Sequence, residues 1–293
     1  MRLRTLPLSL SGIAMGVFLA AADYRIDALT VIFLVLTTVS LQILTNLSNE
    51  LGDTLHGTDT EDRQGMHYSL QEGDMTVGEM KRLIAVMVAL SCIFGLLMIK
   101  FSFGKIFDWH PMTFLILGAA AIWAAMHYTL GKNPYGYRGL GDLFVFLFFG
   151  IATVCGGYFL CAHEFASWII LLPAAAIGCF SVAVLNVNNI RDMQSDDGIR
   201  KTIPLRIGER GARIYQTALV VLGVACFGWC EENVAFCVLP TAPFFLWHII
   251  GVWRRKGRQL DKMLPLLVIT TFVLCFLYGE TFYIESTCPY PIW

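Results

Sequence analysis

Apolar runs of about 20 residues alternate along this chain with short polar segments. An α-helix needs about 20 mostly apolar residues to cross the roughly 30 Å hydrocarbon core of a bilayer. Nine runs of this kind are present, at residues 6–23, 28–48, 83–103, 111–130, 142–161, 166–187, 213–229, 234–253 and 263–283. The pattern therefore predicts an all-α, polytopic membrane protein with nine transmembrane helices, organised as one membrane domain over residues 1–293.

The composition and the placement of charge agree with a membrane protein. The chain is 56% hydrophobic and 15% charged, whereas soluble domains contain about 25% charged residues. With nine spans, 18 of the 21 Lys and Arg residues fall in loops on one side, and such an excess marks the cytoplasmic side. We therefore expect a bacterial cytoplasmic (inner) membrane protein with its N terminus inside and its C terminus outside. The charge is segregated by side, and we expect neither a nucleic-acid ligand nor an obligate protein partner.

Two patches rich in Asn and Asp interrupt the apolar pattern, each where an apolar run ends on the basic side. The first patch lies between Asn46 and Asp53 and includes Asn49. The polar residues of the second patch at helical spacing are Asn186, Asn189, Asp192 and Asp196. On a helix these two sets fall within arcs of about 60° and about 120°. Because polar clusters at membrane depth mark functional sites, the two stripes predict one site built from two halves.

The residue types in these patches favour a divalent metal and phosphate. Carboxylates and amide carbonyls are hard oxygen ligands of the kind that Mg²⁺ takes together with substrate phosphates. Arg63 follows the first patch, Arg191 interrupts the second, and Arg200 and Lys201 follow the second. Guanidinium and ammonium groups bind phosphate oxygens and stabilise a departing diphosphate. The alternative is that the acids are ordinary helix caps and the basic residues follow only the positive-inside rule.

A loop between the two patches adds secondary candidates. It contains Lys132 and several tyrosines, among them Tyr128 and Tyr135. The tyrosines are either anchors at the membrane interface or walls of a pocket, where aromatic faces stabilise a passing carbocation.

Four motifs together resemble the UbiA superfamily of membrane prenyltransferases, and within it the branch that serves menaquinone biosynthesis. They are Arg4-Thr5-Leu6-Pro7, Asn46-x-x-Asn49-Glu50-x-x-Asp53, Tyr128-x-x-x-Lys132 and Asn186-x-Asn188-Asn189-x-Arg191-Asp192-x-x-x-Asp196. The similarity runs over essentially the whole chain. The chain departs from the superfamily's first motif at Glu50 and Gly57, which stand where Asp is usual.

The resemblance implies nine helices around a central cavity and a set of site residues. The expected Mg²⁺ ligands are Asn49, Asp53, Asp59, Asp192 and Asp196. Asp59 is expected to act in place of the motif's last Asp, because Gly57 occupies that position in this chain. The expected substrate contacts are Arg4, Asn46, Asn49, Arg63, Tyr128, Lys132, Tyr135, Asn189, Arg191 and Lys201. The residues expected to be catalytic are Asp53, Lys132, Asp192 and Asp196.

The resemblance also implies a reaction. A polyprenyl group passes from polyprenyl diphosphate to 1,4-dihydroxy-2-naphthoate, CO₂ and diphosphate leave, and demethylmenaquinone is formed. Two alternatives stay open: prenylation of another aromatic acceptor such as 4-hydroxybenzoate, and a polytopic transporter. A transporter predicts polar residues through the outer half of the spans, where Glu280 is the main example.

Overall fold

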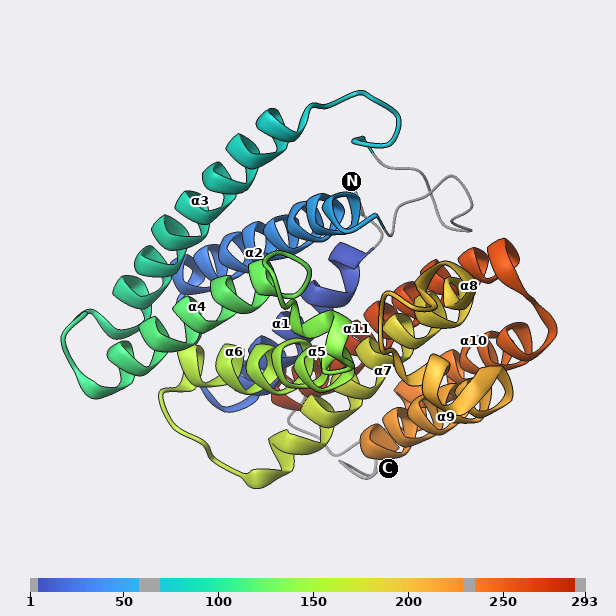
Figure 1. The fold of residues 1–293 in the computed structure, drawn as a ribbon. Helices are drawn as coiled ribbons and strands as arrows, with labels where there is room; N and C mark the ends of the chain where they lie inside the picture. Colours follow the sequence, from blue (N-terminus) through green and yellow to red (C-terminus); the bar gives the residue numbers. More distant parts are fainter. Residues whose placement is uncertain (1–4, 58–68, 229–234, 288–293) are drawn as a thin grey trace.

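The computed structural model describes residues 5–57, 69–228 and 235–287, and these form a bundle of helices (Figure 1). The α-helices are α1 (Leu6–Asp23), α2 (Ala28–Leu55), α3 (Val77–Phe103), α4 (Trp109–His127), α5 (Gly141–Val145), α6 (Thr153–Ala162), α7 (Leu171–Arg191), α8 (Met193–Asp196), α9 (Ile203–Gly228), α10 (Ala235–Arg254) and α11 (Met263–Thr287). Short 3₁₀ segments are η2 (Tyr135–Arg138), η4 (Trp168–Ile170) and η6 (Gly257–Lys262), and η3 (Phe146–Ala152) is a π-helical segment.

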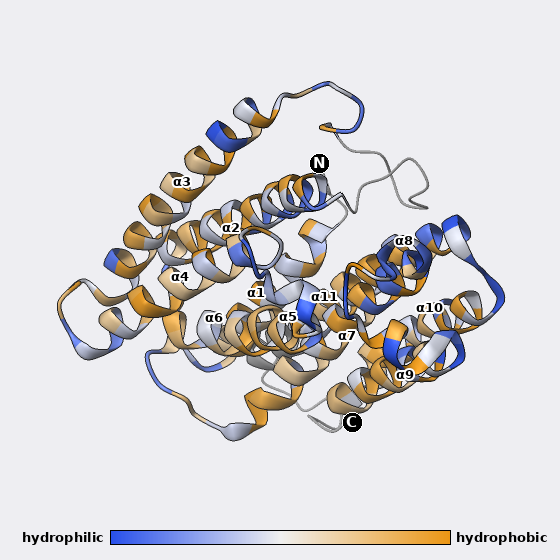
Figure 2. Cartoon of the chain, viewed as in Figure 1, coloured by the Kyte–Doolittle hydropathy of each residue, from blue (hydrophilic) through white to orange (hydrophobic). Residues whose placement is uncertain are grey.

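The predicted fold class is confirmed. Among the described residues, nine helical segments are long and apolar enough to cross a membrane, and α5, η3 and α6 together make one of them. Figure 2 shows hydrophobic residues along the helices and hydrophilic residues gathered at helix ends and in loops. The chain is therefore a multi-span, all-helical membrane protein.

Three helices extend well beyond the apolar runs that predicted them, and one of these is α3, which starts at Val77 and not at residue 83. The run ending at residue 48 belongs to α2, which continues to Leu55 because Glu50 and Asp53 are buried inside the protein. The run beginning at residue 213 belongs to α9, which starts at Ile203 and breaks at Gly208, where φ is 74°. Hydropathy detects contact with lipid, so it misses both the buried polar end of α2 and the exposed charged start of α9.

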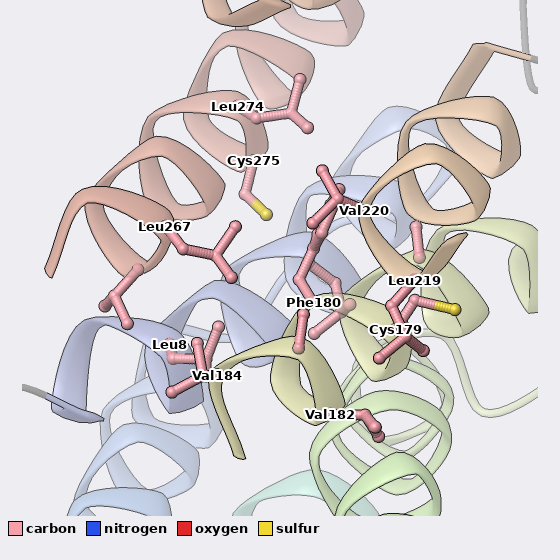
Figure 3. Close-up of a cluster of buried hydrophobic side chains, with 14 of the residues drawn as sticks. Leu8, Cys179, Phe180, Val182, Val184, Leu219, Val220, Leu267, Leu274 and Cys275 are labelled. Carbon is pink, nitrogen blue, oxygen red and sulfur yellow. The ribbon is translucent and has the colours of Figure 1, made fainter. Parts of the chain in front are cut away.

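The central helix is α7, and the largest apolar cluster surrounds it. Figure 3 shows Phe180 of α7 beside Val220 of α9, with Leu267 and Cys275 of α11 nearby. These side chains are inaccessible to solvent. A second apolar cluster joins α2 to α3 and α4. The two polar patches therefore stand on helices that belong to different packing clusters, and they meet at the ends of those helices.

Close helix contacts in the bundle depend on glycine. A Cβ atom added at Gly16 of α1 would clash with the carbonyl oxygen of Val154 and lie 2.8 Å from the backbone nitrogen of Tyr158. Both neighbours belong to α6, and backbone atoms at such a contact have no rotamer to change. By contrast, a Cβ atom at Gly118 of α4 would meet nothing within 4 Å.

We predict that Gly16→Val destabilises the protein and that Gly118→Val does not. Overpacking of a close contact costs about 2 kcal/mol, whereas the helix-propensity change is the same at both positions. Thermal unfolding of the purified variants in detergent measures the difference. Equal unfolding midpoints for the two variants would contradict the close approach of α1 to α6.

Candidate active site

The first patch lies on the last two turns of α2, and its acids are buried. Asp53 is 1% exposed and Glu50 is 2% exposed. Glu50 accepts a hydrogen bond of 3.1 Å from the backbone nitrogen of Leu70. Glu50 therefore holds the segment that leads to α3 against the end of α2, and this contact explains an acidic residue at a position where the resemblance leads us to expect Asp.

The asparagines of the first patch form hydrogen bonds within α2 and with the segment that follows α4. The side-chain Oδ1 of Asn46 accepts from Gln42 Nε2 at 3.3 Å. The side-chain Oδ1 of Asn49 accepts from Thr129 Oγ1 at 3.3 Å, and the same hydroxyl donates to the backbone carbonyl of Ser48 at 2.9 Å. These bonds fix the end of α2 against the segment that follows α4.

The second patch begins on α7 but does not keep a single helical stripe. Asn186 donates to the Ala212 carbonyl at 3.0 Å and to Gln216 Oε1 at 2.8 Å, so it joins α7 to α9. Helix α7 ends at Arg191, and a four-residue helix, α8, carries Asp196. Asn189, Asp192 and Asp196 are all buried.

Arg200 joins the two patches. Its guanidinium contacts the Asp53 carboxylate, and its Nε lies 3.4 Å from Asp196 Oδ1. The guanidinium carbon lies 4.4 Å from the centre of the Tyr137 ring, within the range of a cation–π contact. Tyr137 Oη donates to Asp53 Oδ1 at 3.0 Å. Side chains from α2, η2, α8 and the segment before α9 thus converge on one point.

The electrostatic environment keeps Arg200 charged. Burial alone would lower the pKa of Arg200, but the nearby carboxylates of Asp53 and Asp196 raise it above its usual value. Its side chain is 10% exposed. The cluster therefore contains a permanent positive charge between two buried acids.

A second ion cluster surrounds Arg191. Its Nε and Nη2 bond both oxygens of Asp192 at 2.7 Å and 2.6 Å, and its Nη1 contacts the Asp261 carboxylate of η6. Each of its three nitrogens thus bonds a carboxylate oxygen. Arg191 is a predicted substrate contact, and in the structure it fastens the end of α7 to η6.

A cationic cavity of about 570 Å³ lies next to the cluster formed by Arg200, Asp53 and Tyr137. Its lining residues are His56, Lys132, Asn133, Pro134, Tyr137, Arg138, Ile199, Lys201 and Arg206. Lys132 and Lys201, both proposed from the sequence, therefore face the same space. Because Tyr137 lines the cavity and bonds Asp53, the cavity adjoins the acidic cluster.

The tyrosines of the loop fix its shape. Tyr135 Oη donates to the Ala124 carbonyl at 2.8 Å, and its ring stacks on Phe144 with 4.1 Å between centroids. Burial raises the pKa of Tyr135. Tyr128 meets Tyr135 edge to face at 5.4 Å. These contacts hold the loop beside the cavity.

Three of the predicted site residues, Arg4, Asp59 and Arg63, lie outside the described residues. Within the described ranges, no group of three or more His, Cys, Asp and Glu side chains is arranged to hold a metal. Asp53 and Asp196 nevertheless provide buried carboxylate oxygens that already share one cation, and this donor chemistry fits Mg²⁺.

Sequence reasoning did not select Tyr137 or Asp261 as site residues, and it named Arg200 only as a basic residue near phosphate and not as a partner of the acids. Arg200 follows Asp196 by four residues, the spacing of an ion pair on a helix, and that signal was available. Tyr137 stood among several tyrosines without a distinguishing pattern. Asp261 is 70 residues from its partner Arg191, and nothing local in the sequence connects them.

Comparison with known proteins gives consistent matches. The UbiA prenyltransferase family matches residues 9–282. The 1,4-dihydroxy-2-naphthoate octaprenyltransferase of Escherichia coli (strain K12) is 40% identical over 227 residues, which cover 77% of this chain and 73% of that protein. The protein of the same name from Mycobacterium tuberculosis is 32% identical over 274 residues, covering 91% and 88%. The apo structure of a UbiA homolog from Aeropyrum pernix K1 shares the fold, with a TM-score of 0.72, 18% identity and coverage of 98% of this chain and 100% of that chain.

We predict that Asp261→Ala destabilises the protein, because it removes one of the two carboxylates that bond the buried Arg191. Loss of a charged hydrogen bond of this kind costs about 2 kcal/mol. Denaturant unfolding in mixed micelles measures the change in the free energy of unfolding.

Glu209→Ala is the matched control. Glu209 also pairs with a buried arginine, Arg213, at 2.6 Å, but the Glu209 side chain is 46% exposed. Arg213 additionally donates to the backbone carbonyls of Val252 and Arg255. The control is expected to lose less than about 1 kcal/mol, and a larger loss in the control than in Asp261→Ala would refute the assignment.

Proposed function

Since the chain belongs to the UbiA prenyltransferase family, we propose that it transfers a polyprenyl group from polyprenyl diphosphate to 1,4-dihydroxy-2-naphthoate. The prenyl carbon bonds the ring carbon that carries the carboxylate, CO₂ leaves from that carbon, and diphosphate leaves from the donor. The product is the reduced form of demethylmenaquinone. The names of the relatives from Escherichia coli and Mycobacterium tuberculosis support this acceptor.

The observation that carries the proposal is the convergence of the two acidic patches beside a cationic cavity. Arg200 and Asp53 are 147 residues apart in the chain, yet they are in contact. Lys132 and Lys201 line the adjoining cavity, where ammonium groups stabilise the charge of a departing diphosphate. A polyprenyl diphosphate in this cavity would therefore lie between cationic side chains and the carboxylates that would hold its Mg²⁺.

The chain's own residues perform three tasks in this scheme. Asn49, Asp53, Asp192 and Asp196 would hold Mg²⁺, which supplies charge compensation to the diphosphate when bound. Tyr137 fixes the Asp53 carboxylate through its 3.0 Å hydrogen bond. The apolar spans exclude water from the bond-forming region, so that an allylic cation is not quenched.

The site is proposed to face the cytoplasm of a bacterial inner membrane. Eighteen of the 21 Lys and Arg residues fall on the side of the two patches, and this excess marks the cytoplasmic side. The multi-span fold and the bacterial relatives support the inner membrane as the location.

The reaction is tested by product mass. Membranes containing the protein are incubated with Mg²⁺, a polyprenyl diphosphate and either 1,4-dihydroxy-2-naphthoate or 4-hydroxybenzoate. We expect a prenylated naphthalene that has lost CO₂, and no prenylated benzoate. A product that keeps its carboxylate, or preferred use of 4-hydroxybenzoate, would refute the proposed reaction.

The role of the acids is tested by substitution. Asp53→Asn and Asp192→Asn each remove a negative charge from the proposed ion site and should lower the rate of prenyl transfer by about 100-fold or more. Asp197→Asn is the control, because Asp197 is exposed and adjacent to the second patch. Initial rates measured at equal amounts of folded protein decide the outcome, and unchanged rates in both patch variants would rule out the site.

A further inference from the structure

Arg200 lies where a cation shared by the two patches is required. Asp53 reaches it from α2 and Asp196 from α8, and both acidic residues are buried. Two buried carboxylates that approach each other repel strongly, because little water screens them. The guanidinium offsets this repulsion and holds the halves of the site together.

We propose that Arg200 is a positioning residue that takes the place of a metal ion in the resting site and leaves when Mg²⁺ arrives with diphosphate. The inference rests on the proposed function in one respect, namely that Asp53 and Asp196 hold Mg²⁺. It adds a competition between the chain's own cation and the metal for the same carboxylates.

The bonding of Arg200 is suited to exchange. Its Nε is buried 3.4 Å from Asp196 Oδ1 but makes no hydrogen bond to that oxygen or to another described atom. Arg191 is the contrasting case, since its Nε and both terminal nitrogens reach carboxylates of Asp192 and Asp261. Of these two arginines, Arg200 therefore has more to gain from a new anionic partner.

The position of Arg200 in the chain also places it beside the cationic cavity. It follows Gly198, whose φ of 78° marks a turn, and it precedes the start of α9 at Ile203. Its chain neighbours Ile199 and Lys201 line the cationic cavity. A guanidinium released from the acids is thus next to the space proposed for diphosphate, whose oxygens accept bidentate hydrogen bonds.

A consequence is that Mg²⁺ and diphosphate bind cooperatively. Mg²⁺ alone has to displace Arg200 from its carboxylates, whereas diphosphate gives the displaced guanidinium a new partner. Coupling between two ligands of this kind typically changes affinity by 5- to 150-fold. The resting site therefore binds Mg²⁺ weakly until the donor is present.

The test is a Mg²⁺ titration without turnover. Purified protein in detergent is titrated with Mg²⁺, with and without inorganic diphosphate, and the thermal unfolding midpoint is recorded, since a ligand of the folded state raises it. The native protein should respond weakly to Mg²⁺ alone. Arg200→Gln should start from a lower midpoint and bind Mg²⁺ alone about tenfold more tightly.

Arg213→Gln is the matched control. It also removes a buried arginine, whose partners are Glu209 and the backbone carbonyls of Val252 and Arg255, so it should lower the starting midpoint without any gain in Mg²⁺ affinity. Equal or weaker Mg²⁺ binding by Arg200→Gln, or the same gain in Arg213→Gln, would overturn the inference.

Arg200→Lys covers the case in which the glutamine variant does not fold. It keeps the charge but forms fewer bonds to the carboxylates, so its Mg²⁺ affinity should exceed that of the native protein, and an unchanged or lower affinity counts against the inference. Because the titration needs no prenyl transfer, its outcome is independent of the acceptor assay. A protein that gains Mg²⁺ affinity on loss of Arg200 but forms no prenylated product would refute the proposed function alone.

Discussion

The contact of one guanidinium with two buried carboxylates is the interaction on which the site depends. Asp53 lies on α2, which packs in one apolar cluster, and Asp196 lies on α8, which follows α7 of the other cluster. Two desolvated negative charges at the ends of these helices repel each other. Arg200 offsets that repulsion, and Tyr137 extends the cluster to the loop that borders the cationic cavity. The ion cluster thereby links the acidic and basic parts of the site.

The spans were predictable because lipid imposes a simple requirement on sequence. A helix facing hydrocarbon needs a continuous apolar run, and all nine segments carry one. The end of α2 was placed too early because its polar residues are buried inside the protein, and the start of α9 was placed too late because its first turns carry exposed charged residues. The charge of Glu50 predicts a position outside the membrane span, but in the structure Glu50 is buried and accepts a hydrogen bond from the backbone nitrogen of Leu70. Hydropathy does not report on such a partner.

The acids of the site were also accessible from the sequence, since Asp and Asn at the end of an apolar helix are conspicuous. Their partners were less accessible. Arg200 carried a local signal through its spacing from Asp196, but the bond from Asn186 to Gln216 spans 30 residues, and the contact of Arg191 with Asp261 spans 70. Long-range polar pairs of this kind are set by helix packing, which periodicity and composition do not encode.

Arg191 and Arg200 follow the same acidic patch, and geometry alone separates their roles. The partners of Arg191 lie on α7 and η6, which pack together, so its cluster is contained within one part of the bundle. The partners of Arg200 lie on the two halves of the site, and one of its nitrogens has no hydrogen-bond acceptor among the described atoms. An arginine whose three nitrogens all bond carboxylates within one packed unit stabilises that unit. An incompletely bonded arginine between two units holds them at a distance that a metal ion and a diphosphate can then reset.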